Sequence, residues 1–399
     1  MKFYVFFLIL AMFSWSCTSN DEKSSDSTVA SVCSETSSDA EVYEIFQLGT
    51  TNCNLFCKDK SLSECQTAWG NGEKNLNYQY VAKSWTPLNT VHNESEVYLY
   101  NFTPIDYENV SISDNNGVFK SSIQIKAWNR IKYQHVVSGD NVTVTIPSSN
   151  NPIMLKFANI KTKWKWAPHN YDPDGTHANW WTNWTGAALR ANYIMNYNMA
   201  NFLSTDTFNN VIVNDNITYS DATTTWYDSS WGTYDNNSVI VSRMRDIGAL
   251  FKIGVVHGGT PSGLGGGDVH GVAPHVLYDH MRSSVWSNKG WNGADIWFHE
   301  FAHCLGFSHS SNMTYPQAAP YDSDISGKVQ TAMVNAYKQD NTDPLFPPGD
   351  GQEGIDCNNE LAGLSCPSSR SLYTPPLRKW NLADDQIFDF SESTKYPKD

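Results

Sequence analysis

The chain has 399 residues, which is enough for two or three domains and a large hydrophobic core. Its 27 Lys and Arg residues stand against 41 Asp and Glu residues, and the formal net charge of −14 argues against nucleic acid or an anionic membrane surface as a partner. Because 40% of the residues are hydrophobic and only 17% are charged, the composition also excludes a chain that is disordered throughout.

Residues 1–16 predict an export signal. Lys2 precedes the uncharged apolar run Phe3–Phe13, which is shorter than the roughly 20 residues that cross a bilayer but suits a secretory signal. Cys17 directly follows the small residue Ser16, and this pair resembles the lipobox of bacterial lipoproteins. The resemblance implies an exported protein whose only hold on a membrane is a lipid on Cys17. Ordinary cleavage near Ser16, without a lipid, is the alternative.

The next two segments predict a tether and a β-rich accessory domain. Residues 17–40 are rich in Ser, Thr and Asp and contain no aromatic residue, which is typical of a flexible tether. Within residues 41–165, apolar residues alternate with polar ones from Ile123 to Ala127 and from Val142 to Ile146. Short period-2 runs broken by Asn-Asn-Gly and Ser-Gly-Asp turns predict an antiparallel β-sandwich-like domain. No chemical motif occurs in this domain.

Residues 166–345 predict a second, mixed domain, so the chain as a whole is expected to be α+β. Apolar residues recur at steps of 4, 3, 4, 4 and 3, as on one face of an amphipathic helix: Trp184, Ala188, Ala191, Met195, Met199 and Phe202. The apolar runs at 211–213, 239–241 and 253–256 predict strands between this long early helix and a later helix. Residues 346–399 are expected to form an irregular tail packed on this domain.

One motif carries the chemistry. Residues 299–309 read HEFAHCLGFSH, which is the pattern HExxHxxGxxH. His299 and His303 lie four apart, so on a helix they share a face and can bind one ion. Gly306 can take a left-handed conformation that ends the helix, and His309 then approaches from outside it as third ligand. Three imidazoles leave one position of a tetrahedral zinc ion open for water, and the carboxylate of Glu300 is placed to take its proton.

At this motif the chain resembles the metzincin clan of zinc metallopeptidases, closely over residues 297–316 and loosely over 180–345. Members carry HExxHxxGxxH followed by a Met-containing turn beneath the zinc. The segment Ser311-Asn312-Met313-Thr314-Tyr315-Pro316 matches that turn, with Met333 as the alternative methionine. The resemblance implies one catalytic zinc, peptide-bond hydrolysis and a catalytic role for Tyr315 beside Glu300. It also implies an edge strand for extended substrates, which we place with a mobile rim in the glycine-rich segment 258–278.

The cysteines indicate disulfides rather than a cysteine zinc site. An exported chain tolerates disulfides, and no CxxC…CxxC spacing occurs. We expect a bridge Cys357–Cys366 and a second bridge between two of the residues Cys53, Cys57 and Cys65. Cys304 is expected to be buried or disulfide-bonded rather than a redox switch.

Other candidate ligands receive plainer interpretations. Asp172–Gly175 and Asp350–Gly351 could hold Ca²⁺, because carboxylates in tight turns suit that ion, and surface turns are the alternative. The remaining histidines are expected to be structural or on the surface: His92, His135, His169, His177, His257, His270, His275 and His280.

Two functional interpretations remain from different classes. The leading one is an exported zinc-dependent endopeptidase in which zinc-activated water attacks a peptide bond of a protein or glycoprotein substrate, with Glu300 as general base. The alternative is a surface lipoprotein that binds glycans or glycoproteins and carries an accessory or inactive zinc site. The intact Glu300 and the complete ligand spacing argue against the alternative. A purely structural zinc site conflicts with three ligands rather than four.

Overall fold

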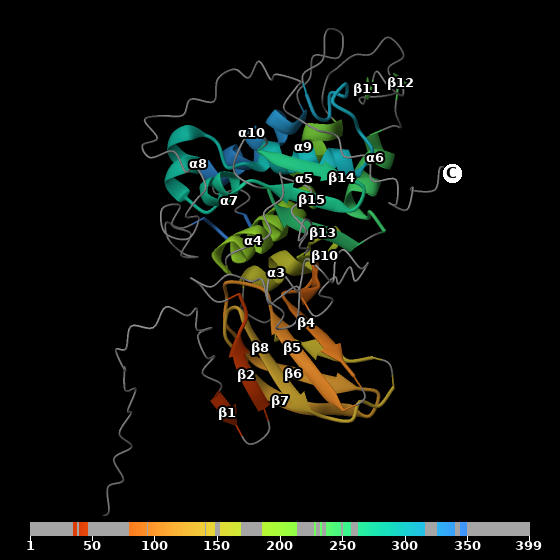
Figure 1. Cartoon of the computed structure of the whole chain (residues 1–399), viewed down its shortest axis with the longest axis vertical. Helices are drawn as coiled ribbons and strands as arrows, with labels where there is room; N and C mark the ends of the chain where they lie inside the picture. The colour runs from red at the N-terminus through yellow and green to blue at the C-terminus, as the bar shows by residue number, and fades with distance from the viewer. Residues whose placement is uncertain are drawn as a thin grey trace, which may run out of the picture. The chain divides into compact units, whose positions relative to one another are not determined.

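The structure is a computed structural model, and it has an α+β fold (Figure 1). It describes residues 35–37, 40–46, 80–93, 95–139, 141–147, 152–168, 186–213, 227–228, 232–233, 237–248, 250–256, 262–315, 325–339 and 344–348. All of them belong to one compact unit, Ser34–Asp399, and the other unit, Met1–Cys33, lies outside the described residues. This mixture of helices and antiparallel sheets is compatible with the predicted α+β class. No helix in these ranges is long and apolar enough to cross a membrane.

Two antiparallel sheets form the first part of the fold. One has the order β1 (Glu35–Ser37), β2 (Ala40–Glu44), β8 (Asn129–Gln134), β5 (Glu96–Asn101) and β4 (Leu88–His92). The other has the order β7 (Gly117–Ile125), β6 (Tyr107–Asp114) and β9 (Thr143–Thr145). β7 and β9 coincide with the two alternating patterns in the sequence, so both predicted strands are confirmed. β1 lies within the range that was predicted to be a tether.

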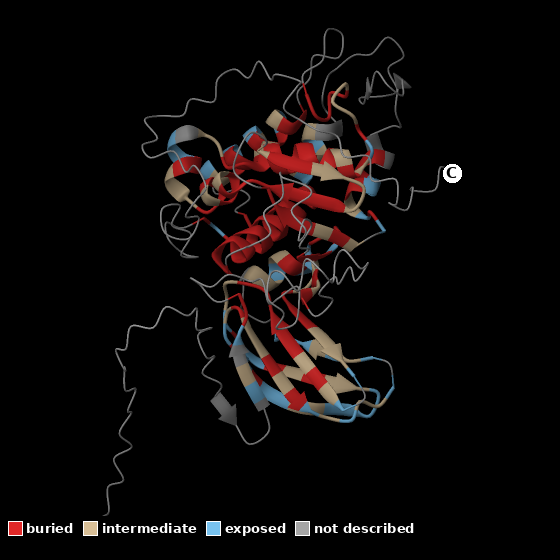
Figure 2. Cartoon of the chain, in the orientation of Figure 1, coloured by how far each residue is buried: buried red, intermediate tan, exposed pale blue. Residues whose placement is uncertain are grey.

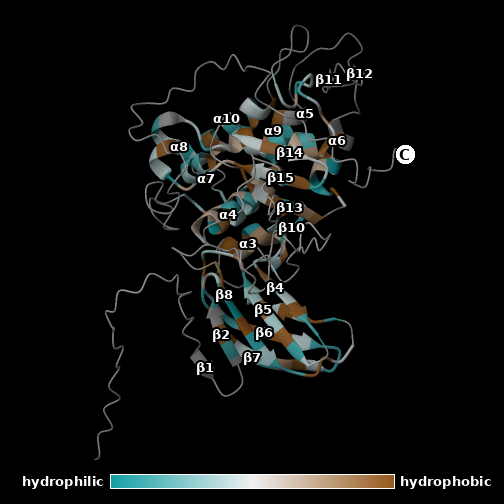
Figure 3. Ribbon diagram, viewed as in Figure 1, coloured by the Kyte–Doolittle hydropathy of each residue, from teal (hydrophilic) through white to brown (hydrophobic). Residues whose placement is uncertain are grey.

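The two sheets share one hydrophobic core. Hydropathy alternates along β5, β6 and β8, as expected for strands with one buried face (Figure 3). The core contains residues from both sheets: Leu88, Val97, Leu99, Tyr107, Val110, Ile112, Ile123, Ile125, Ile131 and Tyr133. Burial of these side chains explains why the alternation in the sequence predicted the strands correctly.

A third, mixed sheet organises the second part of the fold. Its order is β14 (Gly263–Gly266), β15 (Val269–Val272), β13 (Leu250–Val255), β10 (Lys165–Pro168) and β3 (Ala82–Lys83). The three central strands are parallel to one another, whereas β14 and β3 run antiparallel to their neighbours. Within the described part of the chain β14 is therefore an edge strand, and it lies in the glycine-rich segment where an edge strand was predicted. A further pair, β11 (Tyr227–Asp228) and β12 (Gly232–Thr233), is antiparallel.

Helices surround this sheet. They are α3 (Pro152–Ala158), α4 (Gly186–Leu203), α5 (Asp206–Val213), α6 (Asn237–Arg245), α7 (Pro274–His280), α8 (Ser283–Lys289), α9 (Ala294–Cys304) and α10 (Ile325–Lys338). α9 packs against β14, β15 and α10, and α4 packs against α5, α6 and α7. α4 and α9 confirm the predicted long early helix and the predicted motif helix.

The prediction that α4 is amphipathic is wrong. Every residue of α4 except Asn201 is buried, and Figure 2 shows the helix coloured as buried along its length. Two of its buried asparagines bond to backbone carbonyls of neighbouring segments, because a buried polar group without a partner is costly. Asn192 donates to the carbonyl of Gly254 on β13 at 3.1 Å, and Asn198 donates to the carbonyl of Phe346 at 3.1 Å. α4 is thus an interior helix with satisfied polar positions.

Two of the three predicted strands between the helices are also wrong. Residues 211–213 end α5 and residues 239–241 lie in α6, whereas residues 253–255 of the third run belong to the strand β13. Short apolar runs carry no period that separates a buried strand from a buried helical turn. Tertiary packing decides between them, and α5 packs against α4, α6 and α10.

Aromatic side chains place α9 on the sheet. Trp164, the residue directly before β10, stacks on Trp297 of α9 with ring centroids 5.5 Å apart. It also contacts Phe301, one turn further along α9, at 5.1 Å. The indole N–H of Trp164 donates to the carbonyl of Met244 at 2.7 Å, so its buried polar atom is satisfied. In this part of the chain the tryptophans therefore serve packing.

Candidate metal centre

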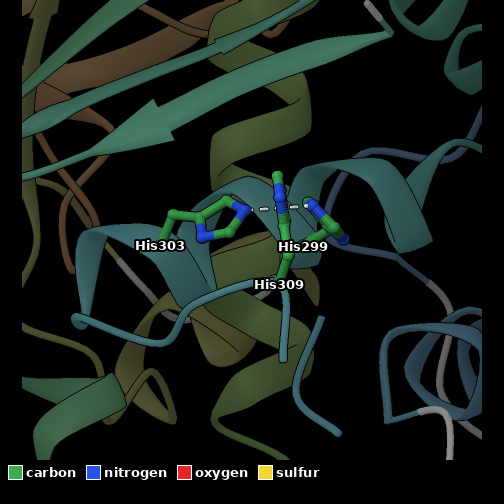
Figure 4. A group of neighbouring side chains, drawn as sticks. All are labelled: His299, His303 and His309. Carbon is green, nitrogen blue, oxygen red and sulfur yellow. Dashed lines mark hydrogen bonds between the residues drawn. The ribbon is translucent and has the colours of Figure 1, made fainter. Parts of the chain in front are cut away.

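The helix α9 aims two histidines at one point. His299 and His303 are four residues apart, and their Nε2 atoms lie 3.1 Å from each other. Figure 4 shows both rings on this helix and His309 on the segment that follows. One nitrogen from each of the three histidines lies within 4.8 Å of the others. The predicted ligand residues are thus brought together.

A glycine ends the helix so that the chain can return with the third histidine. Gly306 has a φ of +92°, a conformation that costs other residues steric strain. The N–H of Phe307 donates to the carbonyl of Ala302 at 3.1 Å, and the N–H of Gly306 donates to that of His303 at 3.0 Å. This pair of hydrogen bonds is the Schellman pattern. The predicted helix stop is confirmed, and His309 follows three residues later.

Backbone carbonyls fix the ring proton of His299 and of His303 on Nδ1. Nδ1 of His299 lies 2.9 Å from the carbonyl of Thr314, and Nδ1 of His303 lies 2.6 Å from the carbonyl of Phe307. A carbonyl oxygen only accepts, so Nδ1–H is the donor in both bonds. In the neutral rings, Nε2 then carries the lone pair and is the ligand atom.

The spacing of the first two donors suits a zinc ion. Two Nε2 lone pairs face each other at 3.1 Å, an arrangement that a shared cation stabilises. Imidazole nitrogens at 2.0–2.1 Å from a tetrahedral zinc stand roughly 3.3 Å apart, close to the separation of His299 and His303. Three neutral imidazoles are also a ligand set that zinc prefers.

A tight turn with a buried methionine follows the third histidine. The N–H groups of Thr314 and Tyr315 both donate to the carbonyl of Ser311, at 3.1 and 3.0 Å, and Met313 is fully buried. The ring of Tyr315 lies 4.5 Å from that of His299 and 5.1 Å from that of His309, measured between centroids. The alternative methionine, Met333, lies within α10 and not in a turn. The turn beside the histidines is therefore the one around Met313.

Glu300 is held between the helix and the edge strand. Its side chain is buried, and Gly263 and Gly265 of β14 lie against it. A Cβ on Gly263 would stand 2.6 Å from Cγ and 2.7 Å from Oε1 of Glu300, and one on Gly265 would collide with the Glu300 carbonyl. Only glycine lets β14 approach α9 this closely, which gives the glycine-rich strand a physical reason.

Cys304 is a buried free thiol. Its Sγ donates to the carbonyl of Val269 at 3.2 Å, and burial raises the pKa of the thiol well above its usual range. A thiol that stays protonated is unreactive. The expectation of a buried cysteine is confirmed.

Two further histidines are structural, as expected. His270 bonds the carbonyl of Trp297 at 2.9 Å, and His280 bonds the carbonyl of Asn292 at 2.9 Å. Burial lowers the pKa of each to about 4. His135 pairs with Asp114 at 3.0 Å, far along the chain from the motif.

Several predicted features lie outside the described residues. These are the lipid-anchor residue Cys17, the cysteines at 53, 57, 65, 357 and 366, and the two candidate calcium turns at 172–175 and 350–351. His169, His177 and His257 also lie outside, as does the tail after residue 348. The sequence thus remains the basis for each of those predictions.

The sequence did not reveal the partners that orient the site. The carbonyls of Thr314 and Phe307 bond the two ring N–H groups, and a backbone acceptor leaves no trace in residue type. The contact of Gly263 with Glu300 joins residues 37 positions apart, so no local pattern marks it. The run of glycines was its one visible signal.

Comparison of the chain with protein-family models, with curated proteins and with solved structures finds no match. Any assignment of function therefore depends on the residues and geometry of the site.

Proposed function

We propose that the protein is a zinc-dependent endopeptidase with a metzincin-like catalytic domain at residues 166–345 and a β-sandwich-like accessory domain before it. The observation that supports this most strongly is the pair of Nδ1–H bonds to backbone carbonyls. They turn Nε2 of His299 and His303 toward a common point, which His309 also approaches. A structural metal site needs a fourth protein ligand, and no further His, Cys, Asp or Glu joins this cluster within the described ranges.

Two residues beside the three histidines have separate proposed roles in hydrolysis. When bound, zinc acidifies water and polarises a carbonyl. The carboxylate of Glu300 takes the proton of the water whose oxygen bonds the peptide carbon, and it passes that proton to the amine as the C–N bond breaks. Tyr315, whose ring lies beside those of His299 and His309, would stabilise the charge that develops on the carbonyl oxygen by a hydrogen bond from its hydroxyl group.

The edge strand supplies a place for an extended substrate. Among the described strands β14 pairs only with β15, so we propose that its other side offers backbone N–H and C=O groups to a peptide strand. Its contact with Glu300 puts such a peptide beside the general base. We therefore propose that the substrate is a protein or glycoprotein segment bound in extended form.

The site of action follows from the N-terminal sequence. The apolar run after Lys2 and the lipobox-like Cys17 support an exported protein, anchored to a membrane by a lipid. Such a location gives the enzyme access to extracellular proteins and glycoproteins. A surface lipoprotein that binds glycans without hydrolysis is the alternative, and the experiment below separates the two.

The test compares the full mature chain with a Glu300→Gln variant. Glutamine keeps the size of the side chain but cannot take a proton at neutral pH. Zinc per chain is counted, and both proteins are incubated with a mixed peptide library and with a glycoprotein mixture read by mass spectrometry. Glu108→Gln, at an exposed position on β6, is the matched control.

We expect one zinc in every protein and cleavage by the wild type and the Glu108→Gln control only. Equal cleavage by the Glu300→Gln variant would refute the role of Glu300. If each of the three proteins binds one zinc but none of them, including the wild type, cleaves peptides or glycoproteins, the result would favour the glycan-binding alternative. Absence of zinc from all three would refute the metal centre itself.

A further inference from the structure

Thr314 makes hydrogen bonds to the first histidine ligand and to the segment that carries the third, although its side chain is not itself a ligand. Its backbone carbonyl accepts the Nδ1–H of His299, the first ligand, at 2.9 Å. Its hydroxyl lies 2.8 Å from the carbonyl of Ser308 and 2.9 Å from that of Ser311. Ser308 and Ser311 flank the segment that carries His309, the third ligand. One residue therefore connects the first ligand to the backbone on both sides of the third.

These bonds lie in a closed environment. Thr314 and Ser311 are both buried, so water cannot readily replace a hydrogen bond that is lost there, and the loss costs free energy. A hydroxyl has one proton and can share it between two carbonyls in a three-centre bond. Without that proton, two buried carbonyls would lose a donor, although each still accepts a backbone N–H: Ser311 N–H bonds Ser308, and Thr314 N–H bonds Ser311.

His309 depends on such support more than the other two ligands do. His299 and His303 project from the regular helix α9, whose own hydrogen bonds hold their backbone. His309 lies in the irregular segment after Gly306, where the chain has left the helix. The hydroxyl of Thr314 is a side-chain tie from the methionine turn to this segment.

We propose that Thr314 is a positioning residue for the metal: its hydroxyl sets the place of His309 while its carbonyl sets the ring of His299. The role depends on the metal-binding part of the proposed function and not on peptide hydrolysis. Loss of the hydroxyl should release the His309 segment, weaken zinc binding and alter the symmetry of the ligand field. Loss of the methyl group alone should have none of these three effects.

The experiment measures metal binding by the full chain and three variants. Thr314→Val removes the hydroxyl and keeps the shape, whereas Thr314→Ser keeps the hydroxyl and removes the methyl group. Thr103→Val is the matched control, because Thr103 is also buried and its hydroxyl also makes two hydrogen bonds, to Asn101 and Tyr107 between β5 and β6. Zinc affinity is measured by competition with a chelator, and the visible spectrum of the cobalt-substituted protein reports the ligand field.

We expect Thr314→Val to bind zinc about 10- to 100-fold more weakly than the wild type, the usual effect of removing a group that orients a ligand. Its cobalt spectrum should change in band position or intensity. Thr314→Ser should stay within about threefold of the wild-type affinity. Thr103→Val should lose stability and keep both its zinc affinity and its cobalt spectrum.

Other outcomes would overturn the proposal. Wild-type zinc affinity and spectrum in Thr314→Val would show that the hydroxyl does not position a ligand. Equal losses in Thr314→Val and Thr314→Ser would assign the effect to packing. If Thr314→Val does not fold, Thr314→Ala takes its place in the same comparison with Thr314→Ser. A wild type that binds zinc but cleaves nothing would count against the peptidase and leave the role of Thr314 standing.

Discussion

Gly263 of the edge strand lies directly against the carboxyl side chain of Glu300. A Cβ at this position would come within 2.6 Å of Glu300 Cγ and 2.7 Å of Oε1. The contact joins the strand that we assign to the substrate with the residue that we assign to proton transfer. It lies on the side chain of Glu300 and not on a ligand, so it offers a way to disturb the base while the metal stays in place.

The Gly263→Ala variant should lose turnover and keep zinc. The new methyl group must push the Glu300 carboxylate aside, and a displacement of about 1 Å costs about 100-fold in rate when a catalytic group needs precise placement. Steady-state kinetics and zinc counting check this expectation. Gly265→Ala is the informative contrast, because its methyl group meets the backbone of α9 and should lower the free energy of unfolding. Unchanged kcat in Gly263→Ala would contradict the proposed placement of Glu300.

The Gly306→Ala variant should combine a loss of stability with a loss of zinc affinity. Alanine in the left-handed conformation costs about 1–2 kcal/mol, and relief of that strain would move the Phe307 carbonyl that holds His303. Gly248→Ala is a matched control, since Gly248 also has a positive φ of +65° and open space around its Cβ. Urea unfolding of the metal-free proteins should show similar losses, and only Gly306→Ala should bind zinc more weakly. Equal zinc affinity in the two variants would count against this coupling.

The metal-free protein should become less stable as the pH falls from about 6.5 to 4. Burial lowers the pKa of His270 and of His280 to about 4, below the ordinary 6.5. Between these pH values each of the two histidines is protonated in the unfolded chain and neutral in the folded chain. The free energy of unfolding therefore does not depend on these histidines above pH 6.5. Below that pH it falls by about 1.4 kcal/mol per pH unit for each histidine, until the pH reaches about 4.

Urea unfolding at pH 7 and pH 5 measures this dependence. A His280→Gln variant removes one of the two titrating groups, so its unfolding free energy should change less between the two pH values than that of the wild type. An identical change in both proteins would mean that His280 does not contribute.

Cys304 should resist alkylation as long as the protein is folded. Burial raises the pKa of the thiol, so little thiolate forms at neutral pH, and reagents do not reach the sulfur. Treatment with iodoacetamide followed by peptide mapping would report the modification of this residue alone. We expect modification in urea and almost none in buffer. Rapid modification of the folded protein would point to an accessible thiol beside the metal centre.

The order of residues in the motif was sufficient to predict the local geometry of the metal centre. Two histidines four residues apart share a helical face, and a glycine three residues later ends the helix, because both effects depend only on neighbouring backbone. The strands β7 and β9 were also predictable, because apolar and polar residues alternate along them in the sequence. Together with the helical patterns, they led to the expected α+β class. The helix and its end depend on interactions between residues close together in the chain, and the strands were predictable because one face of each is buried.

Tertiary structure alone decided the features that depend on distant contacts. α4 is buried on all sides because several elements surround it, and the run at 211–213 is helical because α5 packs among other helices. The carbonyl of Thr314 reaches His299, and Gly263 reaches Glu300, only after the chain has folded. Backbone acceptors and close approaches have no signature in residue type. The sequence by itself therefore determined which residues can bind a metal, and the fold decided how they are oriented and what lies against Glu300.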